Sequence, residues 1–273
     1  MTIVNEDARP FLRWAGSKRR LVPRLREFWP HDGSRYLEAF AGSACLFFSL
    51  GPPVGLLNDM NEHLIRTYKA VRSEPKGVFA RLKQMPRTKE YYLRLRKQAF
   101  DEKDEIKFAA NFIYLNRNCF NGLFRTNKNG EFNVPFSSQR TPQNILKDDL
   151  ITAAKALEET KLSSLDFEAF VRNNVKINDF VYLDPPYAVS NRRIFRQYGP
   201  HSFGVDDLDR LRCLLDYIDG IGASFVLSYA DCKMARQKFC KWKIGRAFVT
   251  RNIAGFSVHR KKSAELFISN GSR

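Results

Sequence analysis

The feature that most constrains the fold is an apolar run that ends at an acid and two prolines. Residues Phe180 to Leu183 have the length and composition of a buried strand, and Asp184-Pro185-Pro186-Tyr187 follows directly. Proline lacks the backbone N–H that a sheet ladder needs, so the strand must end there. In an open α/β sheet, ligands bind at the carboxyl ends of the strands. The sequence therefore places an acid at a candidate ligand-binding edge.

The residue types of this motif suit methyl transfer to the exocyclic amine of a nucleobase. Such an amine is a poor nucleophile because its lone pair is delocalised into the ring. The Asp184 carboxylate and the Pro185 carbonyl are two acceptors that would favour the pyramidal amine formed as a methyl group arrives. Tyr187 offers a flat face on which a base could stack. The plainer alternative is an exposed β-turn, because Asp-Pro and Pro-Pro are common turn signals.

The chain is strongly basic. It has 46 Lys and Arg residues against 29 Asp and Glu, which gives a formal net charge of +17. This charge predicts a polyanionic partner, with nucleic acid the first candidate and an anionic membrane the second. No long apolar run or basic amphipathic anchor supports the membrane, and residues 1–7 contain no apolar segment typical of a signal peptide. The five cysteines are scattered without CxxC spacing, which predicts reduced thiols in a cytoplasmic protein and no metal.

Two earlier stretches are candidates for ligand binding. Residues 36–40 have the pattern of a strand, and the small residues 41–44 would let a ligand approach the backbone closely. The turn is not GxGxxG, so it does not indicate a dinucleotide. A second strand, 54–57, precedes Asp59, which is well placed for ribose hydroxyls or, alternatively, for capping the next helix. The loop 14–18 before a basic helix at 19–28 could hold a ligand, or could simply be a helix start with a packed tryptophan.

A helical segment then separates the second strand from the third. Helical patterns cover 61–85, 91–100 and 106–115, so this region is interpreted as an inserted domain. Asn129-Gly130 predicts that 123–128 and 131–136 form a β-hairpin with a type I′ turn. Its polar, basic arms suit the DNA major groove, where Arg can bind guanine through two hydrogen bonds. An ordinary surface hairpin is the alternative.

The remaining patterns complete an α/β chain. They predict helices at 146–157, 167–173 and 206–217, and strands at 161–165, 224–228, 244–249 and 264–268. Two further basic stretches, 191–199 and 251–262, are candidates for contacts with phosphates.

Taken together, these stretches resemble the DNA adenine methyltransferases of the Dam family. The resemblance rests on FLRWAGSK at 11–18, EAFAGSACLFF at 38–48, NDMN at 58–61, LNRNCFNGLFRTNKNGEFNVPF at 115–136, DPPY at 184–187 and RKKSAELF at 260–267. Their order matches the α group of amino-methyltransferases. It implies an α/β fold of the Rossmann-like class I methyltransferases, with a mixed seven-stranded sheet and an inserted helical DNA-recognition domain carrying a β-hairpin. The catalytic domain would comprise residues 1–60 and 146–273, and the target-recognition domain 61–145, with the hairpin at 118–137.

The resemblance also implies an activity. The family transfers a methyl group from S-adenosylmethionine to N6 of an adenine flipped out of duplex DNA, most often within GATC. Two alternatives stay open: methylation of cytosine N4, which uses a similar pocket, and a catalytically silent DNA-binding protein of the same fold. We expect a monomer in the cytoplasm, associated with double-stranded DNA and of bacterial or phage origin, without a metal or a membrane partner.

Site residues follow from the positions that match the family motifs. Arg13 resembles a position that reaches the first base pair, Arg125 one that reads a guanine, and Pro135 one that contacts a thymine methyl group. Two stretches depart from the family pattern near the expected cofactor: Ser17 replaces the usual glycine, and residues 41–44 contain fewer glycines than is usual. Residues 252–259 do not resemble the family, so the resemblance does not define the specificity for the outer bases. The expected catalytic residues are Asp184, Pro185, Pro186 and Tyr187. The expected cofactor residues are Trp14, Lys18, Glu38, Phe40, Gly42, Asp59, Phe167 and Asp184. The expected DNA contacts are Arg13, Arg117, Asn121, Leu123, Arg125, Asn127, Lys128, Asn133, Pro135, Arg192, Arg193, Arg196 and Arg260.

Overall fold

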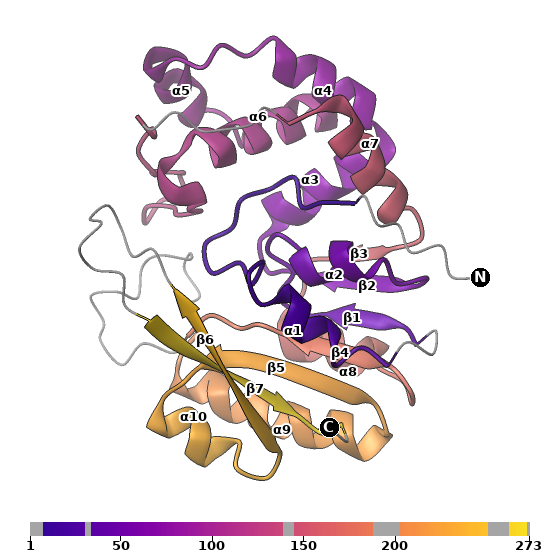
Figure 1. The fold of residues 1–273 in the computed structure, drawn as a ribbon. Coiled ribbons are helices and arrows are strands. Elements are labelled where there is room, and N and C mark those ends of the chain that lie inside the picture. Colours follow the sequence, from indigo (N-terminus) through magenta and orange to yellow (C-terminus); the bar gives the residue numbers. More distant parts are fainter. Residues whose placement is uncertain (1–7, 31–33, 139–144, 188–202, 251–261, 272–273) are drawn as a thin grey trace.

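A seven-stranded sheet forms the centre of the molecule (Figure 1). The computed structural model describes residues 8–30, 34–138, 145–187, 203–250 and 262–271. The strand order is β3-β2-β1-β4-β5-β7-β6; β1 to β5 are parallel, and β7 runs antiparallel between β5 and β6. The predicted mixed seven-stranded sheet is confirmed. The strands are β1 (Tyr36–Glu38), β2 (Gly55–Asn58), β3 (Lys161–Ser163), β4 (Phe180–Leu183), β5 (Ser224–Ala230), β6 (Lys243–Thr250) and β7 (Lys262–Ser269).

Helices cover both faces of the sheet, which explains why β1, β2 and β4 are buried along their whole length. Side chains alternate between the faces of a strand, so Phe180 and Tyr182 of β4 pack in one core cluster and Val181 and Leu183 in another. Helices α1 (Val22–Arg26) and α2 (Cys45–Leu50) contribute to the first cluster. Helices α8 (Phe167–Asn174), α9 (Val205–Ile221) and α10 (Lys233–Lys238) contribute to the second.

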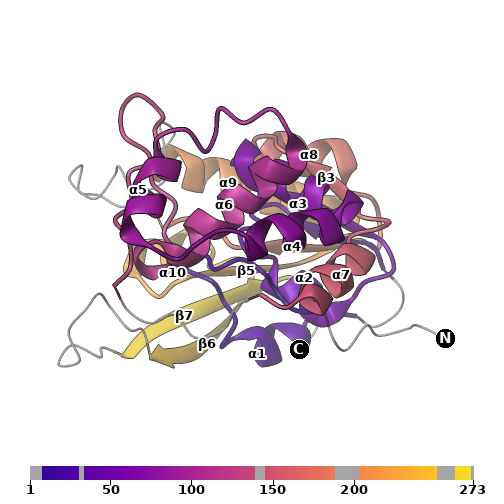
Figure 2. The same cartoon turned by 90° about the horizontal axis from the view of Figure 1, so that it is seen from above.

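The remaining helices form a separate layer above this sheet (Figure 1) and lie across it when seen from above (Figure 2). The layer consists of α3 (Glu62–Ser73), α4 (Pro75–Lys83), α5 (Lys89–Arg96), α6 (Glu105–Asn118) and α7 (Lys147–Ala156). The predicted helix at 61–85 is two helices, because Pro75 lacks the N–H needed to continue α3 and instead begins α4. Tyr68 of α3 packs edge-on against Phe11, so the layer shares the first core cluster with the sheet.

The segment with the predicted hairpin reverses direction, but not through a type I′ turn. Gly130 N donates to Asn127 O and Asn127 N donates to Glu131 O, so the loop has three residues, and of Asn129 and Gly130 only Gly130 has a positive φ (+81°). The Asn127 side chain accepts from Asn129 N and Glu131 N, which fixes this geometry. In the described residues the arms are joined by the isolated bridges Cys119–Phe136 and Thr126–Phe132. Pro135 has no N–H to donate, which helps to explain why no continuous ladder forms.

Other predicted elements are present with shifted ends. The helix expected at 19–28 is the five-residue α1, whereas the helix expected at 206–217 is longer, as α9. Helix α10 was not predicted. Within the described part of the chain, no helix combines the length and apolar character needed to cross a membrane.

Candidate active site

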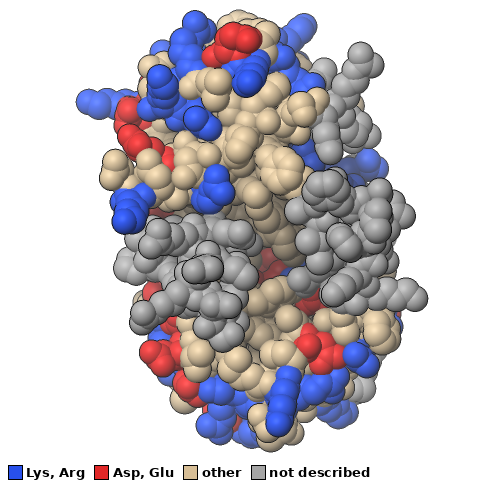
Figure 3. Space-filling view, turned by 90° about the vertical axis from the view of Figure 1, so that its left-hand side faces the viewer, with Lys and Arg blue, Asp and Glu red and all other residues tan. Residues whose placement is uncertain are grey.

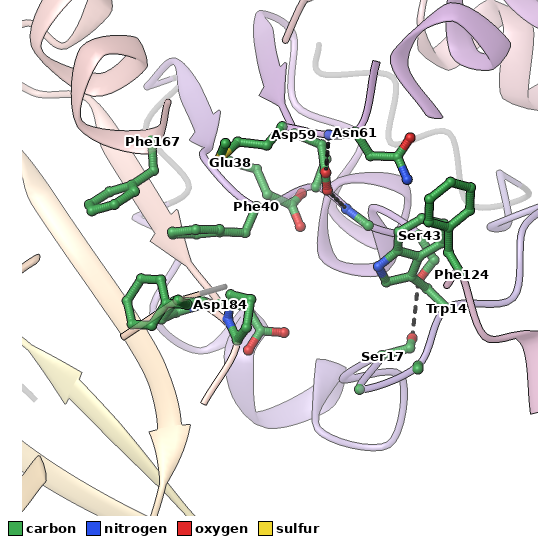
Figure 4. A pocket seen from close by; sticks show the side chains of 18 of the residues that line it. Trp14, Ser17, Glu38, Phe40, Ser43, Asp59, Asn61, Phe124, Phe167 and Asp184 are labelled. Atoms are coloured by element: carbon green, nitrogen blue, oxygen red, sulfur yellow. Dashed lines mark hydrogen bonds between the residues drawn. The ribbon is translucent and has the colours of Figure 1, made fainter. Parts of the chain in front are cut away.

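The candidate active site lies where the order of the strands reverses. From β1 the chain builds β2 and β3 on one side, while β4 pairs with the other side of β1 and leads to β5. Ligands of open α/β sheets bind at such a switch point, outside the carboxyl ends of the strands. A cavity of about 820 Å³ opens there, between Glu38 at the end of β1 and Asp184 after β4 (Figure 4).

The cavity brings together all the residues that were predicted to hold the cofactor or to catalyse. They come from the loop before α1, from the ends of β1, β2 and β4, and from the start of α8. Residues of the segment 115–136, in which the hairpin was predicted, also reach the cavity, namely Phe124, Thr126 and Gly130. The predicted residues on its wall are Trp14, Lys18, Glu38, Phe40, Gly42, Asp59, Phe167, Asp184, Pro185, Pro186 and Tyr187.

Asp184 is held by two donors at one of its oxygens. Lys18 Nζ lies 2.6 Å and Ser228 Oγ 3.0 Å from Oδ1. Burial alone would lower the pKa of Lys18, but the nearby charges of Asp184, Tyr187 and Glu265 raise this pKa well above its ordinary value. Burial raises the pKa of Asp184, and Lys18 and Ser228 oppose that shift. Among the described residues none donates to Oδ2, and Asp184 lines the cavity.

Glu38 is a second buried acid on the cavity wall. Its side chain is 2% exposed, and Tyr36 donates its hydroxyl to Oε2 at 2.9 Å. Burial, with a smaller contribution from Asp184 and Asp59, raises the pKa of Glu38 well above its ordinary value. A bound cation would favour the charged carboxylate and offset this desolvation. Glu38 therefore suits the positive end of a ligand.

Asp59 shapes the small-residue turn (Figure 4). Its Oδ2 accepts from Gly42 N at 2.9 Å and its Oδ1 accepts from Asn61 N at 2.9 Å. Gly42 has φ +48°, and a Cβ at this position would lie 2.7 Å from Cδ1 of Trp14, so only glycine fits without displacement. Asn61 caps α3 by accepting from Leu64 N, so the alternative that Asp59 caps this helix is wrong.

Aromatic rings form another wall. Phe40 stacks on Phe167 with ring centroids 5.3 Å apart, and Phe203 contacts both rings. The Arg210 guanidinium lies 4.7 Å from the Phe167 ring centroid and binds Asp166, Glu168 and Asp207. This wall offers flat apolar surface beside acceptors, which suits a purine.

The sequence analysis missed Ser228, Phe203 and Arg210. Ser228 lies in a strand whose carboxyl end reaches the same sheet edge, and that position is a signal that could have identified it. Phe203 and Arg210 come to the cavity through the packing of α9, for which no motif gives a signal.

The loop before α1 connects the cavity to the segment 115–136. Trp14 stacks on Phe124, with centroids 6.1 Å apart and planes 17° apart. Arg13 is exposed, but its backbone N–H and C=O both bond to the Asn116 side chain, at 2.8 and 2.6 Å. Arg13 therefore lies beside the segment that contains the predicted DNA contacts from Arg117 to Pro135.

The predicted DNA contacts other than Arg13 fall into four groups. Arg125 donates to Asn133 through Nε (2.7 Å to Oδ1) and Nη2 (3.3 Å to O), so these two residues are bonded to each other. Arg117 is half-buried and donates to the Phe11 carbonyl, and Asn127 forms the turn, so both serve the local structure. Asn121, Lys128 and Pro135 are exposed, and Leu123 is half-buried. Arg192, Arg193, Arg196 and Arg260 lie outside the described residues.

Basic side chains are spread over the face that bears the opening. In Figure 3, Lys and Arg lie over the upper, helical part of this face and along its lower edge, above and below a central hollow. Together with the net charge of +17, this distribution suits a polyanion that crosses the hollow.

This sheet, with an antiparallel β7 and an acidic and aromatic cavity at the switch point, defines a Rossmann-like methyltransferase fold. The chain belongs to the D12 class of N6 adenine-specific DNA methyltransferases, whose family pattern matches residues 14–253.

Named relatives agree with this family. The type II methyltransferase M1.LlaDCHI of Lactococcus lactis is 32% identical over 273 residues, which cover 97% of this chain and 96% of the relative. The DNA adenine methylase of Vibrio cholerae is 32% identical over 265 residues, which cover 94% of each chain. The type II methyltransferase M.MjaIII of Methanocaldococcus jannaschii is 33% identical over 244 residues, covering 81% and 84%. The resemblance to DNA adenine methyltransferases is confirmed.

Proposed function

We propose that this protein transfers a methyl group from S-adenosylmethionine to N6 of an adenine flipped out of duplex DNA, within the site GATC. The observation that carries the proposal is that Asp184 and Pro185 border the same cavity as Glu38 and Phe40. A nucleobase amine at Asp184 and a cationic, adenine-containing donor beside Glu38 would therefore share one cavity.

The lining of the cavity fits S-adenosylmethionine. This molecule carries an ammonium group, a ribose with two hydroxyls and an adenine ring. Glu38 would bind the ammonium group, the remaining lone pairs of Asp59 would accept from the ribose, and the Phe40 and Phe167 wall would contact the adenine. When bound, the cofactor supplies an electrophilic methyl group. Trp14 and Gly42 close the turn beside it.

Asp184 and Pro185 would hold the target amine. Oδ2 of Asp184 can accept one N–H of the amine, and the Pro185 carbonyl, next to a second rigid proline ring, can accept the other. Both acceptors stabilise the positive charge that develops on the nitrogen as it bonds to the methyl group. Lys18 keeps Oδ1 occupied, which leaves Oδ2 as the oxygen that faces the base. Tyr187 would stack on the flipped base.

Duplex DNA would bind across the basic face. The net charge of +17 would attract the DNA phosphates, so the affinity for DNA should fall as the salt concentration rises. Arg13, Arg125 and Pro135 are the residues proposed to contact the bases. GATC is the proposed site because the Dam-like segment at 115–136 carries the hairpin of that family. We also propose that the protein is a monomer in solution and associates with DNA in the cytoplasm of a bacterial or phage-infected cell; relatives from a phage and a bacterium support that origin. Light scattering of the purified chain tests the monomer.

Transfer of labelled methyl groups tests the function. Wild-type protein and the Asp184→Ala variant are each incubated with S-adenosylmethionine and with duplexes that contain or lack GATC, followed by nucleoside analysis. We expect N6-methyladenine from the wild type in the GATC duplex alone, and none from the variant despite retained DNA affinity. Label in both duplexes would overturn the site, and N4-methylcytosine would overturn the base. No label in either duplex, with tight binding, would favour the silent DNA-binding alternative.

A further inference from the structure

A buried glutamate of β7 contacts the end of the catalytic motif. Glu265 is 1% exposed, and its Oε1 accepts the hydroxyl hydrogen of Tyr187 at 2.7 Å. Its cross-strand neighbours in β5 and β6 are Ala230 and Ala247. Small neighbours leave room for the longer side chain, and burying a carboxylate is unfavourable unless it is paired. The position therefore indicates a specific role for the carboxylate.

Glu265 continues the hydrogen-bonded chain that begins at Asp184. Lys18 Nζ donates to Asp184 at 2.6 Å and lies 3.3 Å from the Tyr187 hydroxyl, which in turn donates to Glu265. The chain thus joins three regions: the loop before α1, the end of β4 and the last strand of the sheet. The Lys18 charge partly offsets the charges of both carboxylates.

The Tyr187 ring is held at two places. Its edge packs against Tyr229, with centroids 5.3 Å apart and planes 81° apart, while its hydroxyl bonds to Glu265. A hydrogen bond to a carboxylate is short and directional, so it restricts rotation and tilt of the ring more than the ring contact alone. The face of this ring is the surface on which the target base is proposed to stack.

We propose that Glu265 is a positioning residue that fixes the Tyr187 ring and thereby the place of the target base during methyl transfer. This inference rests on the proposed function of the same site. The effect is on geometry: a reacting group displaced by about 1 Å can slow a reaction about 100-fold. Binding of the cofactor, which would be held by Glu38 and Phe40, does not depend on Glu265.

The experiment compares single-turnover methylation rates of the wild type, Glu265→Ala, Glu265→Gln, Tyr187→Phe and the double variant Glu265→Ala/Tyr187→Phe. Saturating S-adenosylmethionine and GATC duplex are used, and a duplex with 2-aminopurine at the target position reports the stacking of the flipped base. Glu158→Ala, an exposed glutamate at the end of α7, is the matched control.

We expect Glu265→Ala to lower the rate about 10- to 100-fold with a cofactor affinity within about threefold of wild type. Glu265→Gln, which keeps an acceptor oxygen, should recover much of the rate. The double variant should be no slower than Tyr187→Phe, because both changes remove the same bond. The 2-aminopurine signal should change in Glu265→Ala and stay unchanged in Glu158→Ala.

Wild-type rates in Glu265→Ala and Glu265→Gln, or additive effects in the double variant, would overturn the inference. If Glu265→Ala does not fold, Glu265→Gln and Tyr187→Phe still decide it, because an unaltered rate in both would show that the bond has no role. Failure of the proposed function is a separate result, namely a wild-type protein that methylates no duplex.

Discussion

The Nζ atom of Lys18 lies 2.6 Å from Oδ1 of Asp184, and only 6% of the Lys18 side chain is exposed. Removing one partner of such a pair leaves the other charge buried without compensation. We expect Lys18→Met to lower the free energy of unfolding by about 3–5 kcal/mol. Urea unfolding followed by circular dichroism measures it.

The double variant Lys18→Met/Asp184→Asn is the control for that prediction. It removes both charges, so it should be more stable than Lys18→Met alone, although inactive. If the double variant is as unstable as Lys18→Met, the loss comes from packing and the two side chains do not form a stabilising ion pair.

Glu38 predicts a pH dependence of cofactor binding. Burial raises its pKa well above the ordinary value, so the free protein keeps Glu38 protonated to a higher pH than an exposed glutamate. An ammonium group beside it lowers this pKa and favours the carboxylate. Binding should therefore release a proton, and affinity should rise with pH between the pKa of the complex and that of the free protein.

Calorimetric titration with S-adenosylmethionine in two buffers of different ionisation enthalpy measures this proton release. Glu38→Gln, which cannot ionise, should bind more weakly and lose the release. Equal proton release by the variant and the wild type would show that another group is responsible.

The strands could be predicted from local patterns, whereas most residues of the cavity wall were predicted from the resemblance to family motifs. The run 180–183 is apolar on both faces, and the prolines after it fix where the strand ends. Parallel strands place their carboxyl ends at one edge, which is why Asp59 and Asp184, each directly after a predicted strand, were candidates for a ligand site. Glu38 was expected there only from the family resemblance.

The missed residues depend on packing between distant elements. Glu265 meets Tyr187 because β7 inserts antiparallel beside β5, and Arg210 reaches Phe167 from α9. Glu265 and Tyr187 each lie in a family motif, RKKSAELF and DPPY, but neither motif indicates that the two side chains meet, and Arg210 lies in no motif. The prediction of a type I′ turn was wrong for a local reason. The Asn127 side chain accepts hydrogen bonds from two backbone N–H groups, which favours a three-residue loop over the two-residue turn that Asn-Gly usually forms.

Gly42 gives a prediction about the shape of the cavity. At φ +48° an alanine is strained by about 1–2 kcal/mol, and its Cβ would lie 2.7 Å from Cδ1 of Trp14. We expect Gly42→Ala to reduce both stability and cofactor affinity, measured by thermal unfolding and by titration with S-adenosylmethionine.

Gly220 in α9 is the control for Gly42, because an alanine should fit there without strain. No heavy atom lies within 4 Å of a Cβ built there, so Gly220→Ala should raise stability by about 0.5–1 kcal/mol and leave cofactor affinity unchanged. Wild-type cofactor affinity in Gly42→Ala would contradict the assignment of this turn to the cofactor.

Variants of Arg125 and Lys128 can distinguish a residue that reads a base from one that binds a phosphate. Arg125 is half-buried and bonded to Asn133, whereas Lys128 is exposed at the turn. To bind a guanine through two hydrogen bonds, Arg125 would have to give up at least one of its two hydrogen bonds to Asn133. We expect Arg125→Ala to remove about 1–3 kcal/mol of binding free energy that depends on one base pair. Duplexes altered at this pair should then bind equally well, while discrimination at the other base pairs of the site is kept.

Lys128→Ala should instead weaken binding to all duplexes about equally and reduce the slope of log K against log salt by about one. Fluorescence anisotropy with GATC duplexes altered one base pair at a time, at several salt concentrations, measures both effects. A uniform loss in Arg125→Ala with a smaller salt slope would make Arg125 a phosphate contact, and base reading would then have to come from Arg13 or Pro135. Asn133→Ala tests the exchange itself: it removes the Oδ1 acceptor of Arg125 Nε and leaves only the backbone carbonyl of residue 133, so it should keep the same base preference while changing affinity.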